Sequence, residues 1–178
     1  MIYSSTFDDR HLEAGVLGVG NLLLRDEGFG VHLIRHLESR YVFPDTVRLM
    51  DGGTSGIFLS PFFEKTNKVL TVDIIKSDEP PGTILRFTQD ELKARSAQLR
   101  MSPHQIGVLE ILEICKLRGK APEQVDFLGV VPLDLSTGIG LSTVLEERLP
   151  VVAAMVLDYL DDLGLRAAVQ KDHRVCTS

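Results

Sequence analysis

Residues 68–75 (KVLTVDII) restrict the fold of this chain more than any other segment. They form a nearly continuous apolar run, which is typical of a strand that is covered on both faces. Such strands belong to parallel sheets, whose two faces are covered by the helices that connect the strands. The chain therefore has to supply helices for both sides of a sheet.

Apolar runs with strand character alternate with segments of helical periodicity through most of the chain. Val31, Ile34 and Leu37, for example, recur at the spacing of one helix face. This alternation predicts an α/β sandwich with a mainly parallel sheet. The expected strands are residues 14–19, 46–51, 68–75, 83–88 (an edge strand) and 125–131, and the expected helices are residues 28–41, 54–64, 102–118 and 141–163.

The length of 178 residues predicts one domain, 1–178, with its core over about residues 14–165. The net charge of −6 argues against nucleic-acid and anionic-membrane partners, because both bind clusters of Lys and Arg. The longest uncharged apolar run, residues 14–24, is too short to span a bilayer, and residues 1–15 lack the apolar centre of a signal peptide. We therefore expect a cytoplasmic protein.

The loop at residues 18–30 (GVGNLLLRDEGFG) matches a nucleotide-binding loop only in part. A dinucleotide fingerprint needs a third glycine where this chain has Leu23, and Asp26 and Glu27 would repel a phosphate at the start of the next helix. Asp51, at the end of the second strand, is the one feature that favours a nucleotide, since it matches the ribose-binding acid. Otherwise the two adjacent acids either cap the helix or contribute to a cation site.

Asp73 and His104 are the other candidate ligands. Asp73 ends the third strand among apolar residues, where a carboxylate needs a hydrogen-bond partner or a cation. His104 follows Ser102, a possible N-cap, and the helix dipole there favours neutral imidazole, the form that binds metals. The alternatives are a hydrogen-bonding role for Asp73 and a surface role for His104. Because parallel sheets bind ligands at the carboxyl ends of their strands, we expect Glu27, Asp73 and His104 to converge there.

Other residue combinations match known metal-binding or catalytic motifs less well. His32 and His36 lie four residues apart, but no Glu follows His32 as in a His-Glu-x-x-His zinc motif, and we interpret both as part of a solvated helix face. The segment 53–56 (GTSG) lacks the Gly-x-Ser-x-Gly elbow of serine hydrolases. Cys115 and Cys176 form no Cys-x-x-Cys pair, and Cys115 is expected in the core.

The motifs taken in order resemble the maturation endopeptidases of nickel–iron hydrogenases. The segments that carry this resemblance are GVGNLLLRDEGFG, DGGTSG, VDIIKS, SPHQIG and GVVPLDLSTGIGLS, between about residues 14 and 163. Members of that family remove a C-terminal extension from the hydrogenase large-subunit precursor after nickel has been inserted. The resemblance implies a three-layer α/β fold, in which a twisted, mainly parallel five-stranded sheet lies between helices. Residues 1–13 and 166–178 lie outside the family pattern, and we assign them no role.

The resemblance also implies roles for four residues. The Glu, Asp and His that contact metal in the family correspond to Glu27, Asp73 and His104, and the aspartate of the DGGT motif, tied to substrate recognition or cleavage, corresponds to Asp51. No nucleophile or base is implied. Two carboxylates and one imidazole hold metal more weakly than the ligands of a resident catalytic zinc. We therefore expect nickel to arrive on the precursor and to be contacted transiently, and we expect no tightly bound nucleotide.

Two other classes of function remain open from the residues alone. One is a metallohydrolase that carries its own zinc or manganese. The other is a nucleotide- or metal-binding accessory module that chaperones the precursor without cleaving it. Metal analysis separates the first from a nickel-dependent endopeptidase, and cleavage of nickel-loaded precursor separates the second.

Overall fold

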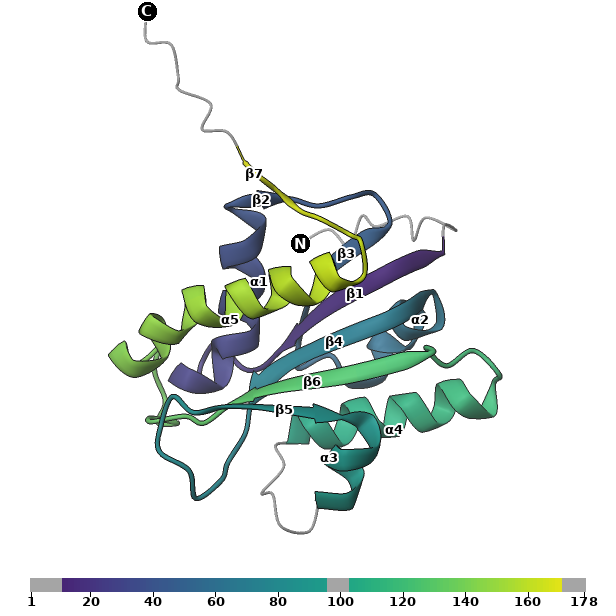
Figure 1. Cartoon of the computed structure of the whole chain (residues 1–178). Helices are drawn as coiled ribbons and strands as arrows, with labels where there is room; N and C mark the ends of the chain where they lie inside the picture. Colours follow the sequence, from purple (N-terminus) through teal and green to yellow (C-terminus); the bar gives the residue numbers. More distant parts are fainter. Residues whose placement is uncertain (1–10, 96–102, 171–178) are drawn as a thin grey trace, which may run out of the picture.

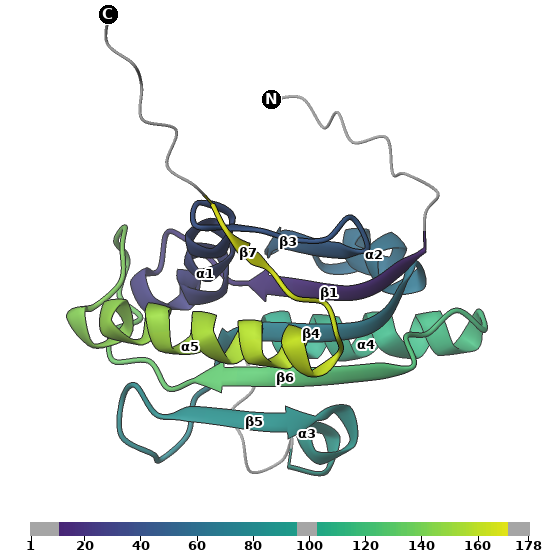
Figure 2. The same ribbon diagram turned by 45° about the horizontal axis from the view of Figure 1, so that its top comes forward.

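A five-stranded sheet forms the centre of the computed structural model, which describes residues 11–95 and 103–170, without the side chains of residues 95 and 103–105. The strand order is β3-β1-β4-β6-β5, and all neighbours are parallel except β5 and β6. Figure 2 shows the arrows of β1, β4 and β6 pointing one way and that of β5 pointing the other. The mainly parallel five-stranded sheet is therefore confirmed. The strands are β1 (Leu12–Val19), β3 (Val47–Gly53), β4 (Thr66–Ile74), β5 (Ile84–Thr88) and β6 (Gln124–Val130).

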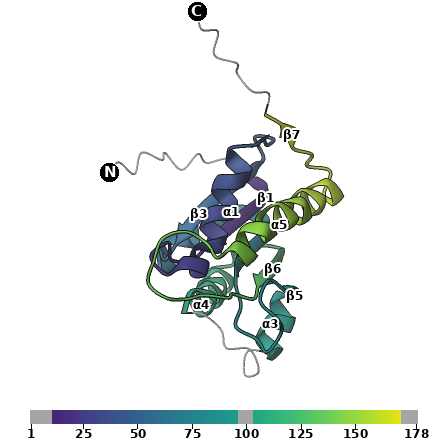
Figure 3. The same cartoon turned by 90° about the vertical axis from the view of Figure 1, so that its left-hand side faces the viewer.

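Helices cover both faces of this sheet, as the apolar run of β4 requires (Figures 1 and 3). One apolar core lies between the sheet and helices α1 and α5, and a second lies between the sheet and helices α2, α3 and α4. Among the described residues, no helix is both long and apolar enough to cross a membrane. The helices are α1 (Phe29–Glu38), α2 (Ser60–Glu64), α3 (Gln89–Arg95), α4 (Pro103–Leu117) and α5 (Thr143–Asp162), with short 3-10 turns η1 (Arg25–Gly28) and η2 (Gly56–Leu59).

The alternation of side chains along β4 decides which core each residue enters. Leu70, Val72 and Ile74 belong to the α1/α5 core, whereas Val69 belongs to the α2/α4 core. Because successive strand residues point to opposite faces, Asp73 shares the face of Val69. The buried carboxylate of β4 is therefore on the side of the sheet where α4 packs.

Three short elements were not expected from the sequence. Helix α3 follows the edge strand β5, and β2 (Tyr41–Val42) pairs antiparallel with β7 (Ala168–Val169). Strand β7 lies in the segment after Arg166, which is outside the family pattern and for which the sequence predicted no helix or strand. A strand of two residues is too short to show a hydrophobic periodicity, so β2 and β7 cannot be predicted from the sequence pattern. The expected helix cap Ser102 lies outside the described residues.

Helix α1 passes over the sheet with its backbone almost touching the strands. A Cβ atom on Gly30 would collide with the backbone carbonyls of Val19 and Val72, and one on Gly18 would collide with the carbonyl of Gly30. Neither glycine has a positive φ, so the requirement is close approach and not an unusual backbone conformation. Gly18 and Gly30 thus place the start of α1 directly over the carboxyl ends of β1 and β4.

We predict that Gly30→Ala lowers the free energy of unfolding by about 1–3 kcal/mol or more, because backbone atoms must move to admit the methyl group. The matched control is Gly107→Ala in α4, where a Cβ meets no atom within 4 Å. Its higher helix propensity should leave stability unchanged or raise it by up to about 1 kcal/mol. Urea unfolding of both variants measures the difference, and equal effects would contradict the close-approach argument.

Candidate active site

The register of the strands shows which residues lie side by side at the carboxyl edge of the sheet. Gly18 on β1 pairs with Asp51 on β3 and with Val72 on β4, so these three residues lie in one row. Asp73 lies one residue beyond that row. Neighbouring strands are about 4.8 Å apart, which separates the backbones of Asp51 and Val72 by about 10 Å.

Asp73 is the most enclosed of the three predicted site residues whose side chains the structure describes. It is 2% exposed, and its Oδ1 accepts a hydrogen bond from the backbone N–H of Ile74 at 2.8 Å. The central position of β4 in the sheet explains this burial, because strands flank it on both sides. Asp73 therefore brings a carboxylate to the carboxyl end of the central strand, on the α4 side.

Glu27 reaches the same edge from the 3-10 turn η1, which contacts β4 and precedes α1. Its side chain is buried at 9% exposure, and its carbonyl accepts a hydrogen bond from the N–H of Asn21 at 3.1 Å. A Cβ on Gly20, whose φ is 145°, would collide with that carbonyl. Gly18, Gly20 and Gly30 thus fold this loop against itself and the sheet, a packing role that accounts for them without a pyrophosphate.

His104 lies in the first turn of α4, but its side chain is outside the described set. The start of α4 does lie at the carboxyl edge, because Gly107, one turn later, lines the same pocket as Val19 of β1 and Gly53 of β3. The described side chains contain no group of three His, Cys, Asp or Glu residues placed to hold a metal ion, and that set does not include His104. The convergence of Glu27, Asp73 and His104 on one metal therefore stays a prediction.

Asp51 ends β3 in a different environment. Its side chain is 42% exposed, Oδ1 accepts a hydrogen bond from the N–H of Gly53 at 3.0 Å, and Oδ2 lies 3.7 Å from the Arg35 guanidinium of α1. Val47 belongs to the α1/α5 core, and alternation along β3 places Asp51 on that same face. Asp51 and Asp73 therefore lie on opposite faces of the sheet edge.

Asp26, next to Glu27, is fully buried and does not cap its own helix, so the capping interpretation is wrong for this residue. Its carboxylate instead accepts four hydrogen bonds from the loop between β6 and α5. The donors are the N–H groups of Leu133 (2.9 Å), Asp134 (2.9 Å) and Ser142 (2.7 Å) and the hydroxyl of Ser142 (2.9 Å). One carboxylate thus fixes both ends of this loop to the turn that carries Glu27.

Backbone hydrogen bonds complete this connection. The N–H of Arg25 donates to the carbonyl of Gly138 at 3.1 Å, and the N–H of Gly138 donates to the carbonyl of Leu23 at 2.9 Å. The Ser142 hydroxyl, besides binding Asp26, accepts a weak bond from the N–H of Leu145 at 3.4 Å and so caps α5. The loops after β1 and β6 therefore form one rigid rim of the site.

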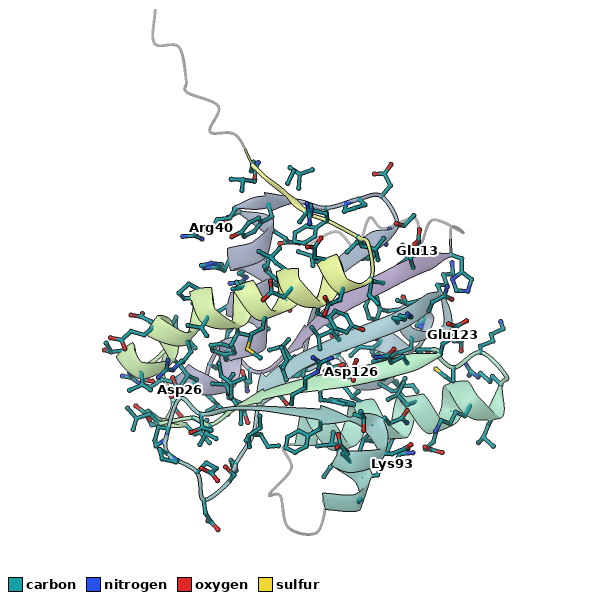
Figure 4. The ribbon with its side chains drawn as sticks, viewed as in Figure 1. Glu13, Asp26, Arg40, Lys93, Glu123 and Asp126 are labelled. Atoms are coloured by element: carbon teal, nitrogen blue, oxygen red, sulfur yellow. The ribbon has the colours of Figure 1, made fainter. Side chains whose placement is uncertain are left out.

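A fourth buried carboxylate, Asp126, was not singled out from the sequence and lies away from this edge. Figure 4 shows it over the middle of the sheet, and it pairs in register with Leu70. Gln124 Nε2 donates to it at 2.6 Å, and Arg86 lies 3.7 Å away. Burial, followed by the charge of Asp126, raises the pKa of Tyr159 to about 12. These groups stabilise the packing of α5 on the sheet and are too far from Asp73 in register to join it.

His32 and His36 were expected on a solvated face, and the structure corrects this. Both are half-buried, and His36 lines a groove between α1 and α5. Burial, together with Arg35 for His32 and Arg40 for His36, lowers the pKa of each imidazole. The reason is the packing of α5 against α1, which helix periodicity cannot show. Cys115 is buried in the core, as expected.

We predict that Asp26→Ala lowers the free energy of unfolding by about 2–3 kcal/mol, since it leaves four part-buried donors without their acceptor. The control is Asp161→Ala, which removes an exposed ion pair with Arg166 and should leave stability almost unchanged. Urea unfolding gives both values, and limited proteolysis should show faster cleavage within residues 133–142 of Asp26→Ala only. Equal losses of stability in the two variants would show that the four hydrogen bonds do not hold the loop.

Comparison with known proteins connects this geometry to a family. Residues 31–159 match the family model described as hydrogenase maturation protease. The chain is 36% identical over 161 residues to the hydrogenase expression/formation protein HupD of Thiocapsa roseopersicina, covering 90% of this chain and 73% of that protein. It is 34% identical over 153 residues to the hydrogenase 2 maturation protease of Escherichia coli, covering 85% and 93%.

Solved structures agree with the sequence relatives. The hydrogenase maturating endopeptidase HybD from Escherichia coli superimposes with a TM-score of 0.83 at 34% identity, over 89% of this chain and 98% of that one. A hydrogenase 2 maturation peptidase from a Thaumarchaeota archaeon superimposes with a TM-score of 0.63 at 32% identity. With agreement in sequence and structure over most of its length, this chain belongs to the hydrogenase maturation protease family.

Proposed function

We propose that this peptidase removes the C-terminal extension of a nickel–iron hydrogenase large-subunit precursor after nickel insertion, and that nickel on the precursor is its recognition mark. Glu27, Asp73 and His104 contact the nickel, and Asp51 acts in substrate recognition or cleavage. The reaction adds one water molecule across a peptide bond. It takes place in the cytoplasm, where the thiols that hold nickel on the precursor stay reduced.

The observation that carries this proposal is the position of Asp73. An ionised carboxylate that is 2% exposed is unfavourable unless hydrogen bonds or a cation compensate its lost hydration. Asp73 lies on the face of the sheet against which α4 packs, His104 belongs to the first turn of α4, and the turn η1, which carries Glu27, contacts β4. An anionic edge of this kind suits a divalent cation better than a phosphate.

The weakness of this ligand set supports a substrate-borne metal. Only one imidazole and no thiolate accompany the two carboxylates, so affinity for nickel alone should be low. Affinity rises when the precursor contributes soft ligands, which makes binding of metal and substrate cooperative. Cleavage then follows nickel insertion and does not precede it. Membership in a protease family argues against the accessory module that binds the precursor without cutting it.

The test is to mix the purified protein with nickel-loaded and nickel-free precursor and to follow the size of the large subunit. We expect shortening of the loaded form only. Equal cleavage of both forms would contradict the recognition role of nickel, and cleavage of neither would contradict the assigned substrate. Stoichiometric zinc or manganese in the active protein as purified would favour a resident-metal hydrolase.

Glu27→Gln, Asp73→Asn and His104→Ala should each slow processing of the loaded precursor by at least about 100-fold, because even residues that only orient metal ligands contribute about 10- to 100-fold. Glu13→Gln, at the opposite end of β1 (Figure 4), is the control and should process normally. Circular dichroism checks that all four variants are folded. Full activity in any two of the three site variants would remove the assignment of these ligands.

Asp51→Asn should impair cleavage or shift the cleavage site while leaving nickel contact intact, because Asp51 lies on the other face of the sheet edge. Mass spectrometry of the product gives the cleavage site, and nickel absorption spectra of the enzyme–precursor mixture report the ligands. Loss of the spectral change in Asp51→Asn would place Asp51 among the metal ligands and contradict the separation of roles.

A further inference from the structure

A pocket of about 240 Å³ opens beside the proposed nickel site, between the carboxyl ends of β1 and β3, the turn η2 and the first turns of α4. Three glycines and three apolar residues make up most of its lining: Gly53, Gly56, Gly107, Val19, Leu59 and Val108. The remaining lining residue is Thr54, so the lining carries no charge. The pocket is smaller than the roughly 300 Å³ or more of pockets that hold a whole drug-sized ligand, and it has room for an apolar side chain.

The pocket lies on the same face of the sheet as Asp73. Val19, which lines it, follows Gly18 on β1, and Gly18 pairs with Val72, the residue before Asp73. Val19 and Asp73 thus each lie one residue beyond the last paired row of two neighbouring strands, whose backbones are about 5 Å apart. Because an extended residue spans about 3.5 Å, a peptide held at Asp73 places a side chain in the pocket within two or three residues.

Exposed apolar residues adjoin the pocket lining in the sequence. Ile57 and Phe58 of η2 are 51% and 81% exposed, and Ile106 of α4 is 48% exposed. They flank the lining residues Gly56, Leu59 and Gly107 in the sequence. Large apolar side chains that stay exposed on neighbouring elements commonly mark a surface where a partner binds.

We propose that this pocket is a specificity pocket, which receives one uncharged aliphatic side chain of the precursor close to the scissile bond. The assignment rests on the proposed function, because it takes the peptide at Asp73 to be the precursor. A charged side chain would lose its hydration there without gaining a charged partner, and is rejected. The glycines leave the volume open, and Gly107 is the point at which it can be filled without disturbing the fold, since a Cβ there meets no atom within 4 Å.

The test compares Gly107→Leu and Gly107→Ala with the control Glu110→Leu, which adds the same bulk to an exposed position on α4 outside the pocket lining. We expect Gly107→Leu to lower kcat/KM for nickel-loaded precursor by at least about 10-fold, in the range of a filled apolar pocket. Gly107→Ala should have a smaller effect and Glu110→Leu none. Thermal unfolding checks stability, and Gly107→Ala keeps the test valid if the leucine variant does not fold.

Substitutions in the precursor identify the occupant. Each of the three residues on either side of the cleaved bond is changed in turn to Ala and to Asp. At one apolar position the wild-type enzyme should lose at least about 10-fold in rate, whereas Gly107→Leu, whose pocket is already filled, should lose little more. Wild-type rates for Gly107→Leu, or additive losses at every position, would overturn the pocket assignment alone. Failure of the wild-type protein to cleave loaded precursor would overturn the proposed function, and the pocket assignment with it.

Discussion

The rest of the site depends on a contact between two backbones that have no side chain between them. Gly30 at the start of α1 rests on the ends of β1 and β4, and Gly18 leaves room for its carbonyl. This contact fixes the turn η1, and with it two adjacent acids, over the carboxyl edge of the sheet. The carboxylate of Asp26 binds the loop after β6, whereas Glu27 lies in the turn that contacts β4. A glycine pattern that resembles a nucleotide loop thus serves the packing of this turn against the sheet.

Much of this arrangement could be predicted from the sequence, because it depends on local periodicity and on the rules of parallel sheets. The apolar run of β4 required a sheet covered on both faces, and the strand ends located Asp51 and Asp73. The role of Asp26 could not be predicted, since its donors lie 107 to 116 residues further along the chain. The half-buried state of His32 and His36 likewise follows from the packing of α5 against α1. The pairing of β2 with β7 depends on the fold, which brings two short segments distant in the sequence next to each other.

The two aspartates of the edge lie on opposite faces of the sheet, and the proposed roles differ accordingly. Asp73 faces α4 and is enclosed, which suits a group that meets a cation. Asp51 is partly exposed beside Arg35 on the α1 face, which suits a group that meets a peptide. The rim that Asp26 holds in place borders the same edge. A substrate that engages both aspartates therefore has to cross the sheet edge from one face to the other.

The most direct measurement is the anomalous nickel signal of a crystal of this protein soaked in millimolar nickel, a concentration that compensates for weak binding. The account predicts one nickel peak in contact with carboxylate oxygens of Glu27 and Asp73 and with a ring nitrogen of His104. A nickel bound instead by His32 and His36 on α1, or three predicted ligands whose side chains point away from one another, would contradict the account.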